Sequence, residues 1–366
     1  MNLKMMSSNS RARRVVLAAF TLLLLAGCAA KSETVSKPSP TETVTPTFNS
    51  LSGKVGTDGP VLVVKIDDTT QAHPQIGLDA ADVVYIEQVE GGLTRLAAVF
   101  SSTIPPRIGP VRSARISDID LLSQYGHVAF AYSGAQTKML PVIASADLEN
   151  LGAQRESQEI YVRDLGRMAP VNLILRADLL MAKLLTHNVT ITTSKNMGWS
   201  FGSKPVGGTV LTSVKLRWPA NSYSASWSAQ EGRWLLLHSG LPDMAEDGKR
   251  LGPTTLVIQK VFITNSIYHD KFGGVTPFSA TIGSGTGYIL RDGEVFSALW
   301  SRLSATAGTS WSLADGTPIS FAPGQVWVAL IDTAPEFTYP APPPSVSAAG
   351  SPTSSTTGSM SPTSTK

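Results

Sequence analysis

The chain has a single cysteine, Cys28, and this residue limits how the rest of the chain can be stabilised. Cys28 follows directly on the apolar run VVLAAFTLLLLAG, which itself follows the basic stretch RARR. Beyond position 28 there is no disulfide framework, no cysteine-ligated metal and no cysteine nucleophile. A folded body must therefore rely on its core and hydrogen bonds, and a hydrophobic content of 42% in 366 residues is enough for two ordinary domains.

The first 28 residues predict export and a lipid anchor. Residues 1–27 have the order of a signal peptide, and an apolar run of about 13 residues is too short for an ordinary membrane-spanning helix. The residues LAGC at positions 25–28 are similar to a bacterial lipobox, in which the cysteine is lipidated. We therefore expect Cys28 to carry the anchor (a diacylglyceryl group, with palmitate among the acyl chains) on the extracytoplasmic face of the cell membrane. A plain secreted protein is the alternative.

The net charge excludes a general role in binding nucleic acid. The formal charge is +3, but residues 1–27 hold four basic residues and no acid. The remaining chain has 26 basic and 27 acidic residues, so it has no excess of positive charge for nucleic acid or a membrane surface to attract. Any basic function must be local.

Composition divides the chain into five parts. A Ser/Thr/Pro-rich tether at 28–56 follows the signal peptide, and a similar tail occupies 336–366. Between them, residues 57–204 mix predicted strands with helices, whereas 205–335 contain short strands rich in β-branched and aromatic residues. The sequence therefore predicts an α+β protein, with an N-terminal α/β domain followed by a mainly β C-terminal domain.

Local patterns place several elements. The apolar run VLVVKI at 61–66 predicts a buried strand, and two further runs joined at Gly91 and Gly92 predict a hairpin. Helices are expected after Ser117 and over 173–188, the second ending at Asn188. The glycine-rich GSGTG at 283–287 is expected to be a turn, since no lysine follows it.

Positive charge is concentrated in RIGPVRSAR, residues 107–115. Residues 91–117 contain four arginines and no acid. A guanidinium stays charged and offers a planar fork of donors that suits phosphate and carboxylate groups, and three nearby prolines stiffen the loop. This pattern predicts a preformed anion site. The alternative is that the arginines pair with nearby acids and only stabilise the fold.

Carboxylates and further arginines extend the candidate site. Glu87 and Glu90 flank the predicted hairpin tip, Asp67 ends a buried strand, and YVRDLGR supplies a second basic pair. Carboxylates beside arginines could hold a metal, act as a base or form salt bridges. No catalytic residue and no metal site is assigned, because the five histidines show no ligand spacing and are expected to be structural. The predicted ligand-binding residues are Asp67, Glu87, Glu90, Arg95, Arg107, Arg112, Ser113, Arg115, Arg163 and Arg167.

The segments PQIGLDAADVVY, EGGLTR and IGPVRSAR closely resemble the first domain of the YerB-like bacterial lipoproteins, and ALWSRLSATAGTSWSLADGTPISFAPGQVWVAL is similar to the end of their second domain. The resemblance runs from about residue 61 to residue 330, most of the folded chain. It implies a two-part architecture and a lipoprotein address, and no activity. Three positions depart from the family pattern: Asp68 stands where Asn is usual, His73 where Arg is usual, and Val171 where His is usual.

Three functions are compatible with these observations. A binding lipoprotein would hold an anionic ligand of the envelope, such as wall polymer or a lipid-linked precursor, through the arginines. An enzyme of cell-wall glycopolymer metabolism would be phosphotransferase-like, similar in residue type to transferases that use polyprenyl-pyrophosphate carriers. In such an enzyme a carboxylate-held Mg²⁺ could assist, and no other cofactor is expected. An assembly factor for an envelope complex would use the arginines only to hold its fold. The membrane, through Cys28, is the one partner that all three share.

Overall fold

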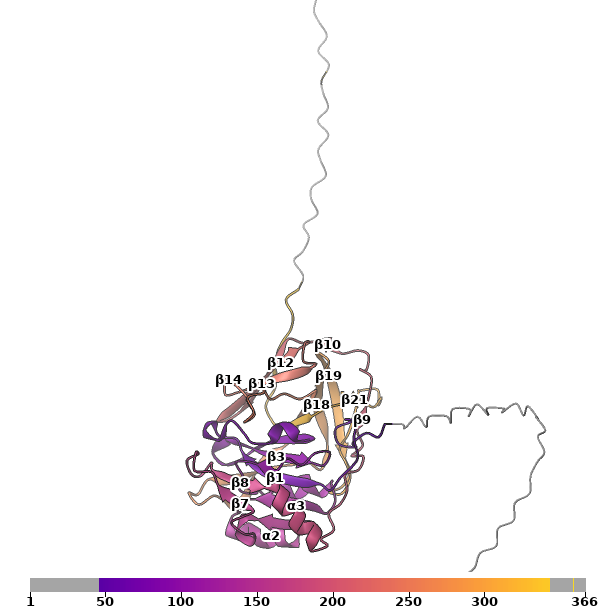
Figure 1. Cartoon of the computed structure of the whole chain (residues 1–366). Coiled ribbons are helices and arrows are strands. Elements are labelled where there is room, and N and C mark those ends of the chain that lie inside the picture. The colour runs from indigo at the N-terminus through magenta and orange to yellow at the C-terminus, as the bar shows by residue number, and fades with distance from the viewer. Residues whose placement is uncertain (1–45, 343–357, 359–366) are drawn as a thin grey trace, which may run out of the picture. The chain divides into compact units, whose positions relative to one another are not determined.

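The computed structural model describes residues 46–342 and residue 358 (Figure 1). The predicted signal peptide, the predicted lipidation site Cys28, the first part of the predicted tether and most of the predicted tail lie outside the described residues. Within the described part of the chain, no helix is both long enough and apolar enough to cross a membrane.

An eleven-stranded mixed sheet takes strands from both predicted domains. Along it the order is β10-β19-β18-β15-β22-β2-β3-β1-β5-β6, and β20 pairs with β19. The parallel pairing of β2 with β22, Val83 opposite Val326, joins segments that lie far apart in the chain. The strands are β1 (Leu62–Asp67), β2 (Val83–Gln88), β3 (Thr94–Phe100), β5 (Val128–Tyr132), β6 (Leu148–Gly152), β10 (Thr209–Val210), β15 (Thr255–Lys260), β18 (Gly283–Arg291), β19 (Glu294–Arg302), β20 (Ser310–Ser312) and β22 (Val326–Ile331).

The strand β1 is buried on both faces, as its continuous apolar run predicts. Successive side chains of a strand point to opposite faces. On one face Leu62 and Val64 join a core that includes Trp234, whereas on the other Val63 joins a core that includes Tyr125. The central sheet therefore has a packed layer on each side.

A second, antiparallel sheet supplies the layer that contains Trp234. Its order is β14-β13-β12-β11-β23, and in β13 buried residues alternate with more exposed ones, as expected for a sheet with one packed face. Its strands are β11 (Ser213–Trp218), β12 (Asn221–Ser228), β13 (Arg233–His238), β14 (Leu241–Pro242) and β23 (Glu336–Thr338).

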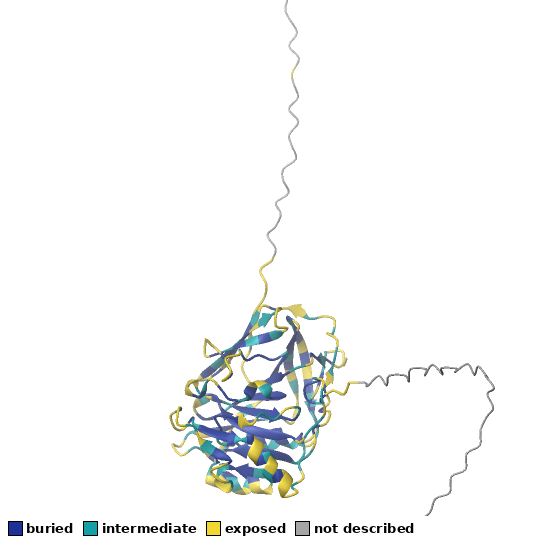
Figure 2. Cartoon of the chain, in the orientation of Figure 1, coloured by how far each residue is buried: buried dark blue, intermediate teal, exposed yellow. Residues whose placement is uncertain are grey.

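Helices and small sheets cover the rest of the central sheet. Figure 2 shows the central strands in dark blue and the outer side of the helix α3 in yellow. The helices are α1 (Ser117–Ser123), α2 (Leu140–Ser145) and α3 (Ala177–Thr186), and the single-turn 3₁₀ segments are η1 (Thr70–Ala72), η2 (Leu78–Ala80), η3 (Glu90–Gly92), η4 (Thr137–Met139) and η5 (Ala153–Arg155). The small sheets are β4 (Arg107–Ile108) with β8 (Leu173–Arg176) and β7 (Tyr161–Arg163), β16 (Ile263–His269) with β17 (Val275–Ser279), and β9 (Ser200–Phe201) with β21 (Ser320–Phe321).

The α+β class with a mainly β C-terminal part is confirmed, and four local predictions differ from the structure. The expected helix over 173–188 begins only at Ala177, because the first four residues pair in β8. The expected turn at 283–287 is the start of β18 instead. The fold also begins before residue 57, since Leu51 is fully buried, and β23 uses the first residues of the predicted tail.

Two of the three glycines in GSGTG are explained by close packing against the strand rather than by a turn. A Cβ on Gly285 would lie 2.7 Å from Nε1 of Trp300, and one on Gly287 would lie 2.4 Å from the carbonyl oxygen of Ile258. Only glycine allows the two neighbours to approach the strand this closely.

Candidate functional site

The segment that carries the arginines is held rigidly between two strands. The N–H of Asp67 donates to the Pro110 carbonyl over 2.9 Å, and the N–H of Arg112 donates to the Lys65 carbonyl over 2.8 Å. On the other side, the N–H of Val111 donates to the Leu173 carbonyl over 2.6 Å. The segment therefore pairs with the end of β1 on one side and with Leu173 on the other. These hydrogen bonds fix the backbone that carries the arginine side chains.

Three of the predicted arginines converge on one cavity. Arg95 comes from β3, opposite Asp67 in the register, whereas Arg112 and Arg115 come from the segment after β4. All three line a cavity of about 1000 Å³, which we call the arginine cleft. Ser113 and Glu90, which were predicted with them, line the same cleft.

Two of the three guanidiniums have a carboxylate partner. Nε of Arg112 lies 2.6 Å from Oδ2 of Asp67, and Nε and one terminal nitrogen of Arg115 donate to Oε2 of Glu90 over 2.8 and 2.6 Å. Glu90 also accepts a hydrogen bond from the Thr276 hydroxyl, and Asp67 accepts one from the Thr69 N–H. These two carboxylates are therefore already engaged.

Arg95 has no carboxylate partner within the described residues. Its hydrogen bond runs to the carbonyl oxygen of Ser113, over 3.1 Å. Burial, together with the nearby guanidiniums of Arg115 and Arg112, lowers the pKa of Arg95 to about 9. At neutral pH it is still a cation, so the cleft contains a guanidinium that forms no ion pair with a described carboxylate.

The walls of the arginine cleft combine polar and apolar groups. Val89, Leu93 and Met139 contribute apolar surface, and Gln136 and Thr137 contribute amide and hydroxyl groups. A second cavity of about 670 Å³ shares Arg112 and Pro170 with the cleft and is lined further by Arg163, Ser133 and Tyr161. Arg112 thus stands where two cavities meet.

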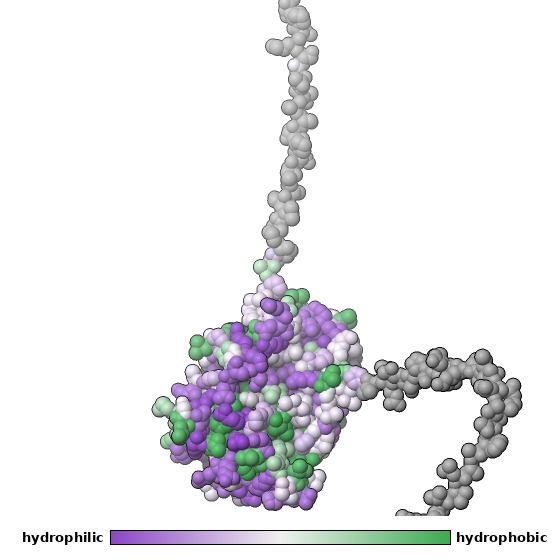
Figure 3. Space-filling model, in the orientation of Figure 1, coloured by the Kyte–Doolittle hydropathy of each residue, from purple (hydrophilic) through white to green (hydrophobic). Residues whose placement is uncertain are grey.

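The hairpin of β16 and β17 forms a wall that the sequence analysis did not assign. His269, Asp270, Lys271 and Phe272 at its tip all line the arginine cleft, and Phe272 is 85% exposed. In Figure 3, green apolar side chains form separate groups among purple polar ones on the face shown. The sequence signal at this hairpin is the turn-forming DKFGG with a cation and an aromatic residue side by side.

Four predicted residues are placed differently. Arg107 lies outside the cleft, 3.6 Å from the Glu246 carboxylate, and Arg167 donates to the carbonyls of Ala72 and Pro74 over 3.0 and 2.7 Å. Arg163 lines the second cavity and donates to the Asn172 side chain over 2.7 Å. Glu87, the fourth, is fully buried in the central sheet.

Glu87 belongs to a buried ionic group beneath the cleft. Nζ of Lys65 lies 2.9 Å from Oε1 of Glu87 and 2.8 Å from Oδ1 of Asp118. Burial, and then the neighbouring Asp118, raises the pKa of Glu87 to about 7. The sequence did carry a signal for this group, because Lys65 and Glu87 are charged residues inside apolar strands, where an unpaired charge is very costly.

The start of the helix α1 meets the end of the arginine segment. The helix α1 has seven residues, and Asp118 in its first turn accepts the N–H of Arg115 over 2.6 Å. Asp118, rather than a ligand, therefore accepts the hydrogen bond that the backbone offers at this end of the loop.

Chemically, the arginine cleft combines hydrogen-bond donors with apolar surface. It offers several guanidinium donors on a rigid backbone, apolar walls and two engaged carboxylates. Planar guanidinium forks bind phosphate or carboxylate oxygens in a bidentate manner.

Comparison with known proteins places the chain in a family. Residues 49–190 match the family model described as "Protein of unknown function (DUF3048) N-terminal domain", and residues 214–328 match the corresponding C-terminal domain. The chain is 23% identical over 282 residues to "Putative lipoprotein YerB" of Bacillus subtilis (strain 168), covering 76% of this chain and 82% of that protein. It shares the fold of the YerB crystal structure from Bacillus subtilis, with a TM-score of 0.67, 20% identity and coverage of 80% of this chain and 99% of that one. Because the two models together match more than half of the chain, it belongs to the DUF3048 family.

Proposed function

We propose that this DUF3048 protein is a membrane-anchored extracytoplasmic lipoprotein that binds an anionic cell-envelope ligand in the arginine cleft. The observation that carries the proposal is Arg95, a largely enclosed guanidinium that has two cationic neighbours and no carboxylate partner among the described residues. Clustering like charges costs free energy in the free protein, and an anion bound between them would recover it.

Phosphate is the anionic group that we expect. Arg95 and Arg112 together present donors from two directions, and a phosphate has three or more oxygens to accept them. A cleft of about 1000 Å³ is much larger than a single phosphate, and its apolar walls suit a ligand with a sugar or lipid portion. Wall polymer fragments and lipid-linked precursors both have this chemistry.

The anchor belongs to the same proposal. We infer that Cys28 is lipidated and holds the fold at the extracytoplasmic face, in agreement with the lipobox-like sequence and with the lipoprotein name of the relative in Bacillus subtilis. The part of the predicted tether that precedes the described fold, residues 28–45, would keep the cleft close to envelope ligands.

The enzyme alternative has less support from the geometry. A phosphotransferase would need a carboxylate free to hold Mg²⁺ or to take a proton. Asp67 and Glu90 are engaged by arginines, and Glu87 lies in the buried ionic group instead of the cleft. Among the described residues that line the cleft, only Asp270 is a carboxylate without an arginine partner, and its Oδ1 accepts the N–H groups of Phe272 and Gly274 over 2.8 Å. An enzyme would have to use this residue of the β16–β17 hairpin.

A ligand screen on the lipoprotein in detergent tests the proposal. Inorganic pyrophosphate, wall polymer fragments and lipid-linked precursors are added to wild type, to Arg112→Gln and to Arg107→Gln, and the melting temperature and calorimetric affinity are recorded. A ligand at 100 times its Kd should stabilise wild type by about 2.7 kcal/mol. We expect this gain in wild type and Arg107→Gln and a loss of it in Arg112→Gln. Equal gains in a folded Arg112→Gln protein, or no ligand effect at all, would refute the proposal.

A further inference from the structure

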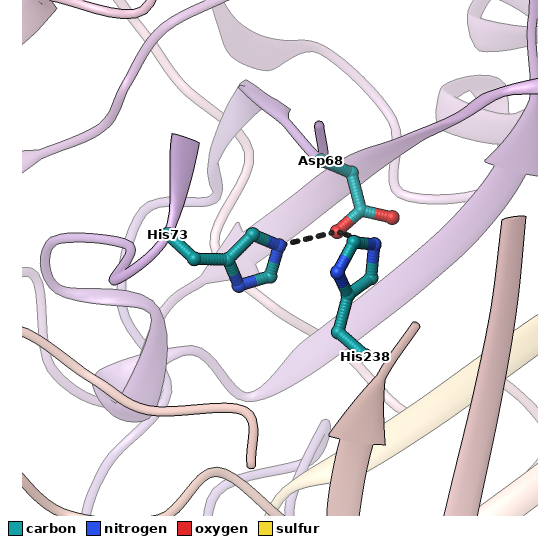
Figure 4. A group of neighbouring side chains, drawn as sticks. All are labelled: Asp68, His73 and His238. Carbon is teal, nitrogen blue, oxygen red and sulfur yellow. Dashed lines mark ion pairs between the residues drawn. The ribbon is translucent and has the colours of Figure 1, made fainter. Parts of the chain in front are cut away.

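Three side chains that could ligate a metal converge at the end of β1, outside the arginine cleft. Asp68 directly follows β1, His73 follows η1, and His238 is the last residue of β13 (Figure 4). Nε2 of His73 lies 3.5 Å from Oδ1 of Asp68, and Nε2 of His238 lies 3.9 Å from the same oxygen. The imidazole rings are stacked with their centroids 4.2 Å apart. One candidate ligand atom from each residue thus lies within 4.8 Å of the other two.

Each of the three is set in place by groups around it. Nδ1 of His73 lies 3.0 Å from Oδ1 of Asp243, and its Nε2 faces Asp68 on the other side of the ring. Oδ1 of Asp68 accepts the Tyr223 hydroxyl over 2.6 Å, and Oδ2 accepts the Asn221 amide over 3.2 Å. A histidine that is oriented by a carboxylate through its other ring nitrogen, beside a hydrogen-bonded carboxylate ligand, is the usual arrangement around a protein-bound metal.

Three buried polar atoms at this place have no hydrogen-bond partner among residues 46–342. They are Nε2 of His238, Oδ2 of Asp243 and Oε1 of Gln75, in residues that are 5%, 1% and 0% exposed. Buried polar atoms without partners are rare, and each needs an explanation such as a bound ion. A cation between Asp68, His73 and His238 would give His238 Nε2 a partner.

The donor set selects the class of ion. Two imidazole nitrogens and one carboxylate oxygen suit Zn²⁺ and related divalent transition metals rather than Ca²⁺ or Mg²⁺, which prefer oxygen ligands alone. In a tetrahedral zinc site, nitrogen ligands at 2.0–2.1 Å lie about 3.3 Å from one another. The two N···O separations of 3.5 and 3.9 Å are close to the spacing of such ligands, and binding would also turn the imidazole rings, whose planes now differ by 22°.

We propose that Asp68, His73 and His238 bind a divalent transition metal of the Zn²⁺ type. One competing contact must change on binding: the Gln75 amide nitrogen lies 3.1 Å from His73 Nε2. Reversing this amide brings the unpartnered Oε1 toward the metal, where it can serve as a fourth ligand. The site would join β1 of the central sheet to β13 of the second sheet, because its ligands come from both.

Metal titration of the lipoprotein in detergent, first treated with EDTA and then freed of it, tests this inference. We expect saturable binding of one Zn²⁺ per chain, a rise in melting temperature that EDTA reverses, and a visible absorption spectrum of tetrahedral type with Co²⁺. His238→Gln should weaken Zn²⁺ binding at least tenfold. His187→Gln, which removes an exposed histidine at the end of α3, is the matched control and should bind normally.

The opposite results would overturn the inference. If Zn²⁺ and Co²⁺ show no saturable binding to wild type, or if binding survives in His238→Gln, the three residues are an ion-pair group without metal. Should His238→Gln fail to fold, the Co²⁺ spectrum and stoichiometry of wild type decide the question alone.

Discussion

Replacing Arg95 should separate the binding and structural interpretations of the arginine cleft. The variant Arg95→Met keeps an apolar stem of similar length and removes the guanidinium. It loses one hydrogen bond, to the Ser113 carbonyl, and breaks no ion pair that the structure describes. It also removes the charge that lies beside Arg112 and Arg115.

The expected gain in stability follows from the electrostatics. Burial and the two neighbouring guanidiniums lower the pKa of Arg95 from its ordinary value to about 9, so the folded protein disfavours the charged form. At about 1.4 kcal/mol per pKa unit, this is an upper limit of about 5 kcal/mol. The side chain is partly exposed, so solvent screening reduces the effect, and the lost hydrogen bond costs about 1 kcal/mol. We expect Arg95→Met to be more stable than wild type by about 1–2 kcal/mol while binding pyrophosphate at least tenfold more weakly.

Urea unfolding and isothermal titration with pyrophosphate measure the two effects. Arg107→Met is the matched control, because Arg107 lies on the same segment, outside the cleft and beside Glu246. Its affinity for pyrophosphate should equal that of wild type. If Arg95→Met is less stable than wild type and binds pyrophosphate as tightly, Arg95 is a structural residue and the reasoning is wrong.

Three further predictions concern the buried ionic group around Glu87, the β16–β17 hairpin and Gly287 in β18. Folding raises the pKa of Glu87 from 4.5 to about 7, so the folded protein binds this proton more tightly than the unfolded chain does. The free energy of unfolding should therefore fall as pH rises from about 4.5 to 7. Glu87→Gln should remove up to about 3 kcal/mol of that decrease in urea unfolding measured at pH 5 and pH 7.5; an unchanged slope would contradict it. Lys271→Gln should weaken pyrophosphate binding about 2–5-fold by calorimetry, since the exposed ammonium acts through a screened charge, and unchanged affinity would remove the hairpin from the site. Gly287→Ala should lower the free energy of unfolding by about 2–4 kcal/mol, because the new Cβ would meet the Ile258 carbonyl at 2.4 Å, whereas Gly273→Ala at an open turn, where φ is positive, should cost about 1 kcal/mol.

Local patterns predicted much of the secondary structure, but not how the strands pair. The run VLVVKI indicates β1 because its apolar side chains suit a strand buried on both faces. Nothing in the sequence near Val326 indicates that it pairs with Val83, because register between distant strands depends on tertiary packing. Tertiary packing also explains why residues 173–176 form a strand although the sequence predicts a helix over 173–188. The pairing of Leu175 with Ile108 outweighs their local helical pattern.

In the candidate sites, likewise, only the contacts between residues close in sequence could be predicted. Arg112 and Arg115 share a short rigid segment, so their proximity could be predicted from sequence alone. Arg95 joins them because β3 pairs with β1, which places it opposite Asp67. The hairpin tip at Lys271 enters the cleft from a distant part of the chain and carries only a turn signal. His238 is likewise far from Asp68 in sequence, so no ligand spacing could indicate the cluster.

A crystal structure of the protein with bound pyrophosphate tests the central claim most directly. The account predicts one anion in the arginine cleft, with its oxygens within hydrogen-bonding distance of the Arg95 and Arg112 guanidiniums and the Arg112–Asp67 contact retained or lengthened. An anion bound elsewhere on the chain, or a cleft without anion at a concentration that saturates calorimetric binding, would contradict it.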